Sequence, residues 1–231
     1  MRWKIFGMVA GFLAVSAASA QAEGLTADIY GKVSVVSMDK SPTGDNSGVI
    51  VFIRKVNDNK GFKPPAAAAI MASQDMDFVP EVLPVLAGTT VAFPNRDDTV
   101  HNAFSLSKAD PFDLDSYGKG PGKKVVFKNL GIVNVNCNIH PAMAGYIMVL
   151  GNPFFTVTDD QGNFIIRDVP AGVYTVVSWF PFGFIQESVV DLTKASNGKF
   201  GSESVKGVKV DFELTKEREG TGHKNKYGKS Y

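Results

Sequence analysis

Three side chains that bind soft metal ions lie within seven residues of one another in the second half of the chain. Cys137 supplies a thiolate, His140 an imidazole and Met143 a thioether, in the spacing Cys-x-x-His-x-x-Met. A turn that leaves a strand can direct all three donors toward one point, because the backbone reverses direction between them. The segment is therefore a candidate metal-binding loop.

A second imidazole, that of His101, lies 36 positions before Cys137. Two imidazoles, one thiolate and a weak axial thioether form the donor set of a mononuclear type 1 copper site, in which one site holds both Cu(I) and Cu(II). Zinc does not select a thioether, and an iron–sulfur cluster needs more than one cysteine. The donor set predicts one copper ion bound by His101, Cys137, His140 and Met143.

Cys137 is the only cysteine of the 231 residues, so it has no partner for a disulfide within the chain. The ordinary alternative is a buried, unreactive thiol, since a lone cysteine behaves as a small apolar residue. Another alternative is a nucleophile with His140 as its base, but no carboxylate beside the loop would orient that base. The neighbouring donors favour a metal ligand, and we expect a protein that is not an enzyme.

The first 22 residues have the pattern of a secretory signal peptide. Arg2 and Lys4 precede an uncharged apolar run, and small residues then allow cleavage after Ala20 or Ala22. The apolar run is too short for a membrane-spanning helix. We therefore expect a periplasmic or secreted protein. Its mature chain, with 22 basic and 23 acidic residues, has no excess of positive charge for nucleic-acid binding.

The elements that must position these donors are strands, so the predicted fold class is all-β. The 17 Phe, 23 Gly and 12 Pro suit short strands joined by tight turns. Val133, Val135 and Cys137 share one face of a strand because strand side chains alternate, which directs the thiol into the core. Strands are expected at 29–35, 49–53, 82–85, 89–93, 125–127, 145–150, 155–158, 164–166, 173–179 and 208–214.

Residues 66–151 resemble the plastocyanin-like cupredoxins. The resemblance lies in Leu83-Pro84-Val85, Gly88-Thr89-Thr90-Val91, Phe93-Pro94-Asn95 and His101-Asn102, and in a Cys137–Met143 loop spaced as in amicyanin. It implies a β-sandwich that holds one copper ion near one end, with the four ligands named above.

The resemblance also gives roles to residues beside the ligands. It implies that Asn102 ties the two ligand loops together, with its backbone N–H directed at the Cys137 sulfur. Amicyanin-like loops have proline before the second histidine, whereas this chain has Ile139. The additional N–H of Ile139 is expected to donate to the thiolate and to alter the reduction potential.

A second module is indicated on both sides of the first. Residues 156–164 and 170–174 resemble the prealbumin-like, carboxypeptidase regulatory-like fold, whose first two strands match 31–33 and 48–53. The whole chain resembles exported cupredoxin-domain proteins labelled methylamine utilization proteins, a label that does not imply a substrate.

We therefore predict that a cupredoxin domain, 61–151, is inserted into a sandwich made of 25–60 and 152–215. A disordered tail is expected at 216–231. The simpler alternative places 25–151 in one cupredoxin that is followed by a second domain.

The predicted function is single-electron transfer between redox partners. Four protein donors leave no open position for a substrate, and Pro141 and Ala142 beside the second imidazole suit brief docking of a partner protein. One alternative is an envelope module that binds protein or glycan through Trp179 and the phenylalanines at 180, 182 and 184, although such aromatic residues more often form a core. Another alternative is copper trafficking.

Overall fold

The computed structural model describes residues 25–56, 61–181 and 183–216. The predicted signal peptide and nearly all of the predicted tail lie outside these residues. More than half of the described residues are in β-strands, and the one helix among them is a short 3-10 helix at Leu192–Lys194, which confirms the predicted all-β fold class. In the described part of the chain, no helix has the length and apolar character needed to cross a membrane.

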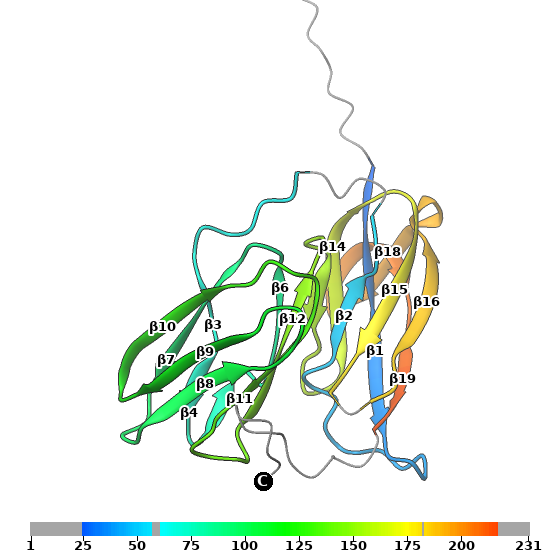
Figure 1. The fold of residues 1–231 in the computed structure, drawn as a ribbon. Coiled ribbons are helices and arrows are strands. Elements are labelled where there is room, and N and C mark those ends of the chain that lie inside the picture. The colour runs from blue at the N-terminus through cyan, green and yellow to red at the C-terminus, as the bar shows by residue number, and fades with distance from the viewer. Residues whose placement is uncertain (1–24, 57–60, 182, 217–231) are drawn as a thin grey trace, which may run out of the picture.

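The described residues contain nineteen strands, which form two β-sandwiches that lie side by side (Figure 1). They are β1 (Thr26–Val36), β2 (Ile50–Ile53), β3 (Ala69–Ile70), β4 (Ala72–Gln74), β5 (Asp77–Val79), β6 (Val82–Leu86), β7 (Thr90–Asn95), β8 (His101–Ser105), β9 (Phe112–Tyr117), β10 (Gly120–Val126), β11 (Gly131–Asn136), β12 (Ala144–Leu150), β13 (Phe155–Val157), β14 (Asn163–Pro170), β15 (Val173–Trp179), β16 (Gln186–Asp191), β17 (Ser196–Phe200), β18 (Glu203–Lys209) and β19 (Phe212–Thr215).

The first sandwich joins the two ends of the described chain. One sheet has the order β14-β1-β18-β17, with β19 also paired to β1, and the other has the order β13-β2-β15-β16. Alternating residues of β1 face the core, where Ile29 and Val33 are fully buried, and they pack with Val51 and Val176 of the opposite sheet.

The second sandwich contains the strands from β3 to β12. One sheet has the order β10-β7-β4-β5, with β3 also paired to β7, and the other has the order β6-β12-β11-β8-β9. Its core is rich in phenylalanine: Phe78, Phe93 and Phe127 are almost fully buried together with Val135 and Ile147.

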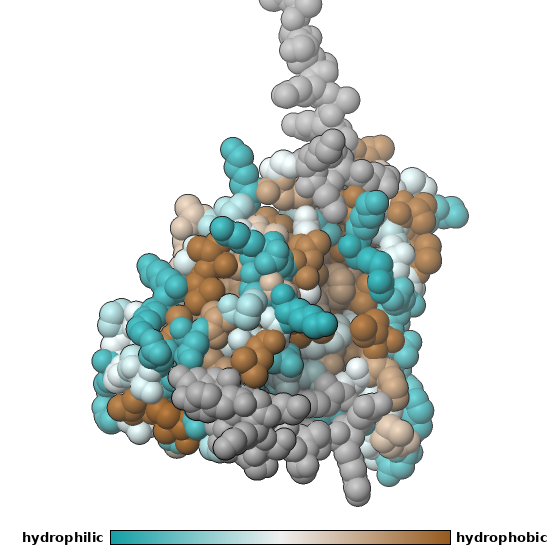
Figure 2. Space-filling model, viewed as in Figure 1, coloured by the Kyte–Doolittle hydropathy of each residue, from teal (hydrophilic) through white to brown (hydrophobic). Residues whose placement is uncertain are grey.

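On the surface of the molecule, polar and apolar side chains are interspersed over the face seen in Figure 2.

The strand pairing crosses the chain in the way that an inserted domain requires. β1 pairs with β14, β18 and β19, and β2 pairs with β13 and β15. Within the described residues, the strands between 69 and 150 pair only with one another. The first sandwich is therefore built from strands on both sides of residues 69–150, and the insertion of a cupredoxin domain with the bounds 61–151 stays a prediction.

Two predictions at the C-terminal end of the first sandwich need correction. The single strand expected at 208–214 is divided into β18 and β19, because the Asp211 carboxylate, rather than a backbone carbonyl, accepts from the Lys32 N–H at 2.8 Å. Lys216, placed in the tail, instead continues the sandwich: its N–H donates to the Val36 carbonyl at 2.7 Å.

The two sandwiches are joined by an apolar contact. Outward-facing residues of β6 and β12, among them Val82, Met148 and Leu150, form one buried cluster with Ile50 and Trp179 of the first sandwich. The Trp179 ring also meets the ring of Tyr146 edge-on, with centroids 6.1 Å apart. This cluster, called the joint below, fixes the second sandwich against the first.

Candidate metal centre

The predicted donors converge at one end of the second sandwich. β11 ends at Asn136 and β12 begins at Ala144, and these two residues are paired, so residues 137–143 form a loop between neighbouring strands. His101 begins β8, which pairs with β11 on its other side. A backbone hydrogen bond of 3.0 Å from Met143 N–H to the His140 carbonyl closes the turn.

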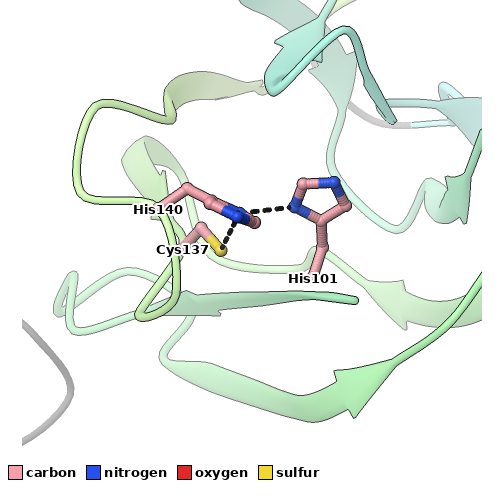
Figure 3. Close-up of side chains that lie close together, drawn as sticks. All are labelled: His101, Cys137 and His140. Atoms are coloured by element: carbon pink, nitrogen blue, oxygen red, sulfur yellow. Dashed lines mark hydrogen bonds between the residues drawn. The ribbon is translucent and has the colours of Figure 1, made fainter. Parts of the chain in front are cut away.

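Three of the four predicted ligands face one another (Figure 3). The Nδ1 atoms of His101 and His140 are 3.0 Å apart, and the Cys137 sulfur is 3.9 Å from the His140 Nδ1. One ligand atom from each residue lies within 4.8 Å of the others. His101 and Cys137 are fully buried, whereas His140 is half-buried. The structure thus brings two nitrogen donors and one sulfur donor together below the surface.

Met143, the fourth predicted ligand, is fully buried and belongs to the same hydrophobic cluster as Cys137. It directly precedes β12, at the end of the loop that carries the thiol and one imidazole. The thioether therefore belongs to the buried apolar core that also contains the thiol, and its role as the axial ligand stays a prediction.

The sequence analysis missed Asp97, which contacts the first histidine. Its Oδ2 lies 2.8 Å from the His101 Nε2. Because an ionised carboxylate only accepts hydrogen bonds, the Nε2 carries the proton, and in the neutral ring this leaves the Nδ1, which faces His140, as the acceptor. This tautomer is the one that a metal bound among the three donors requires.

The pKa values of the polar groups favour metal binding. Burial acts to raise the pKa of Asp97, but the backbone N–H groups of Met76 and Asp75 and the ring of His101 hold it below the usual value, so the carboxylate is ionised. Burial first, and then the electrostatic interaction with the His101 ring, lower the pKa of His140. A lowered pKa keeps the His140 imidazole neutral, the form that binds a metal.

Asn102 connects the two ligand segments, as the resemblance implied. Its side-chain oxygen accepts from the Asn138 N–H at 2.7 Å, and Asn102 itself is buried next to His101. This bond fixes the start of the 137–143 loop against β8. The predicted approach of the Asn102 and Ile139 N–H groups to the sulfur stays a prediction.

The donor set fits copper. Two imidazole Nδ1 atoms and one buried thiol match the trigonal part of a type 1 site, and the thioether at the end of the same loop matches its weak axial ligand. Copper bound there would supply a one-electron couple. The chain itself supplies the orientation of both rings, through Asp97 and the closed turn, and a shell of apolar side chains that excludes water.

Replacing Met143 by alanine is expected to keep copper bound but to shift its reduction potential, because a weak axial ligand tunes the couple more than it holds the ion. The apoprotein is expected to lose about 2–5 kcal/mol of stability from the buried cavity. Copper titration and voltammetry measure both effects. Met143→Leu, which fills the space without a sulfur, is the control for packing. Complete loss of copper binding in both variants would make Met143 an equal ligand rather than an axial one.

Comparisons with known proteins identify fold neighbours but no close relative. No family model matches the chain, and no curated protein matches it. Among solved structures, a purple cupredoxin from Nitrosopumilus maritimus is 24% identical, with a TM-score of 0.32, over 35% of this chain and 98% of that one. Amicyanin from Paracoccus versutus is 22% identical, with a TM-score of 0.34, over 43% of this chain and 96% of that one.

The copper-containing nitrite reductase of Thermus scotoductus is also similar. It is 29% identical, with a TM-score of 0.35, over 42% of this chain and 25% of the reductase. Each of these matches covers less than half of this chain. Evidence for a metal centre in this protein therefore rests on its own buried His101 and Cys137 and on the half-buried His140 beside them.

Proposed function

We propose that this chain is an exported type 1 copper protein that transfers single electrons between redox partners. In this proposal residues 61–151 are a cupredoxin domain inserted into a carboxypeptidase regulatory-like sandwich. The observation that carries it is the convergence of the buried His101 and Cys137 with the half-buried His140 within 4.8 Å, in a loop that ends with the buried Met143. One copper ion bound by these four residues provides the redox couple.

The way the donors are held suits a carrier of electrons. An electron carrier works fastest when its ligands move little between oxidation states, because each displacement adds to the barrier for transfer. Here both segments are fixed, since Asn102 binds the loop to β8 and Asp97 binds the His101 ring. We expect voltammetry of the copper-loaded mature protein to show one reversible one-electron wave. An irreversible response, with copper lost on reduction, would contradict the carrier function.

The surface beside His140 suits a brief encounter with a partner. Ile139 is 43% exposed, Pro141 and Ala142 are exposed on the other side of the histidine, and Val100 precedes the other imidazole with 46% exposure. Small, largely apolar contacts are typical of weak redox encounters. We propose that a redox partner docks here, with the half-buried His140 ring between the partner and the metal.

Ala142→Glu tests this docking surface. A charge on it is expected to slow electron self-exchange by about tenfold or more, because two copies of the chain would then bring like charges together at close range. The absorption spectrum should not change, since Ala142 is not a ligand. Val189→Glu, at a 72% exposed position on β16 in the other sandwich, is the matched control. Equal self-exchange in the parent and in Ala142→Glu would contradict the route through His140.

The other functions are less well supported by the structure. The proposed aromatic binding surface loses its largest member, because Trp179 is buried in the joint. Copper trafficking needs ligands that a partner can reach, yet His101 and Cys137 are fully buried. Burial likewise removes Cys137 from contact with a substrate, so we propose that Cys137 is not a catalytic nucleophile.

A further inference from the structure

The carboxylate of Asp97 joins the first copper ligand to a hairpin on the opposite sheet. Its Oδ1 accepts from the Asp75 N–H at 2.8 Å, and its Oδ2 accepts from the Met76 N–H at 3.1 Å. The same Oδ2 lies 2.8 Å from the His101 Nε2. Three donors from two different segments therefore converge on one side chain, which is only 15% exposed.

The Asp97 carboxylate also stabilises the turn of this hairpin. Asp75 and Met76 form the two-residue connection between β4 and β5, and both have positive φ angles, of 56° and 65°. Such turns normally contain glycine or asparagine, because other residues pay a steric cost in the left-handed region. By accepting from both N–H groups, Asp97 offsets part of that cost.

The loop that carries Asp97 is itself fixed in place. Asn95 is buried; its side-chain oxygen accepts from the Asp97 N–H at 2.9 Å, and its amide donates to the Thr99 carbonyl at 2.8 Å. The Arg96 N–H donates to the Ser73 carbonyl of β4 at 2.9 Å. The carboxylate is thus held in position on both sides before any metal binds.

We propose that Asp97 is a positioning residue that fixes the tautomer and ring orientation of His101 and makes the copper site favour Cu(II). This inference rests on the proposed copper function. A carboxylate that accepts the Nε2 proton raises the basicity of the Nδ1, and a more basic ligand stabilises the higher charge. The same bond prevents the ring from rotating when the oxidation state changes. The hairpin of β4 and β5 is in this way a structural support of the metal site.

The test compares Asp97→Asn with Asp98→Asn. Both variants remove one negative charge from adjacent positions, but Asp98 is 91% exposed and forms an ion pair with Lys119. Cu(II) affinity is expected to fall about 10- to 100-fold in Asp97→Asn, as is typical when the outer partner of a ligating histidine is lost. Cu(I) affinity should fall less, so the reduction potential should rise. Asp98→Asn should have the same Cu(II) affinity, Cu(I) affinity and reduction potential as the parent.

A spectroscopic measurement separates positioning from simple folding effects. In the Cu(I) form, the His101 Nε2–H should give a proton resonance protected from solvent exchange in the parent and lost in Asp97→Asn. If that variant does not fold, the comparison is repeated in a Met76→Gly background, where glycine accepts the positive φ angle without help from the carboxylate.

Two results would overturn the proposal while leaving the copper function intact. Equal potential shifts in Asp97→Asn and Asp98→Asn would show a general effect of charge. An unchanged potential and Nε2–H signal in Asp97→Asn, with only lower stability, would show that Asp97 supports the hairpin alone. Failure of the parent protein to bind copper would instead contradict the proposed function.

Discussion

Replacing Cys137 by serine is expected to abolish the intense visible absorption of the copper-loaded protein. That absorption arises from charge transfer between a thiolate and Cu(II), and Cys137 is the only cysteine in the chain. Cu(II) affinity should also fall by more than the roughly 10- to 100-fold that follows loss of an outer hydrogen-bond partner, because a direct ligand is removed. Absorption spectroscopy and copper titration of the purified variant measure both changes.

The control for this prediction is Cys137→Ala. Cys137 is fully buried in an apolar cluster, so the serine hydroxyl will also cost about 1–3 kcal/mol of stability if it finds no partner. Alanine removes the ligand without adding a buried hydroxyl. Both variants should therefore lose the absorption band, while the serine protein should be the less stable of the two. Persistence of the band in either variant would exclude Cys137 as the ligand.

Replacing Trp179 by alanine is expected to be the most destabilising change outside the metal site. The side chain is 8% exposed and lies in the joint, where it packs against Val82, Met148 and the ring of Tyr146. Loss of a buried tryptophan typically costs about 3–5 kcal/mol. Because both sandwiches contribute to the joint, we expect unfolding to separate into two transitions, with the spectrum of bound copper unchanged in the folded protein.

Trp179→Ala removes the one tryptophan of the predicted mature chain, because Trp3 lies in the predicted signal peptide. Unfolding of this variant cannot be followed by tryptophan fluorescence, so calorimetry and circular dichroism are the suitable measurements. Phe184→Ala is the matched control, since this aromatic side chain is 49% exposed and its loss should change stability by no more than about 0.5 kcal/mol. A single unfolding transition with unchanged stability in Trp179→Ala would show that the joint does not hold the two sandwiches together.

Much of the candidate site can be predicted from the sequence because its chemistry is local. Cys137, His140 and Met143 occupy one short loop, and the alternation of Val133, Val135 and Cys137 places the thiol on the core face. The structure shows both the loop and the burial of its sulfur residues. His101 lies far away along the chain, and it was found through its residue type and its resemblance to a known first-ligand segment.

Asp97 was missed because its role depends on pairing between distant strands. In the sequence it is one of two consecutive aspartates in a loop, a pattern usual for solvated turns. Only the pairing of Ser73 with Asn95 brings the hairpin of residues 75 and 76 over this carboxylate. The four-residue separation from His101 was the one available signal, and it is too common to identify a contact.

Some strands missed by the sequence analysis lie at the edges of the sheets. β16 and β17 contain many polar residues and show little alternation, so their identity as strands comes from pairing with β15 and β18. Strand propensity depends strongly on such neighbours. Where one face is clearly buried, as in β1 and β12, the apolar pattern alone located the strand.

Titration of the metal-free mature protein with Cu(II), followed by absorption spectroscopy, tests the central claim most directly. We predict that the intense thiolate-to-copper band grows until one equivalent of copper is bound, disappears on reduction and returns on reoxidation. The same endpoint should be found by metal analysis after removal of free copper. A protein that binds copper without this band, or that gains it at a stoichiometry other than one per chain, would contradict a single type 1 site at His101, Cys137, His140 and Met143.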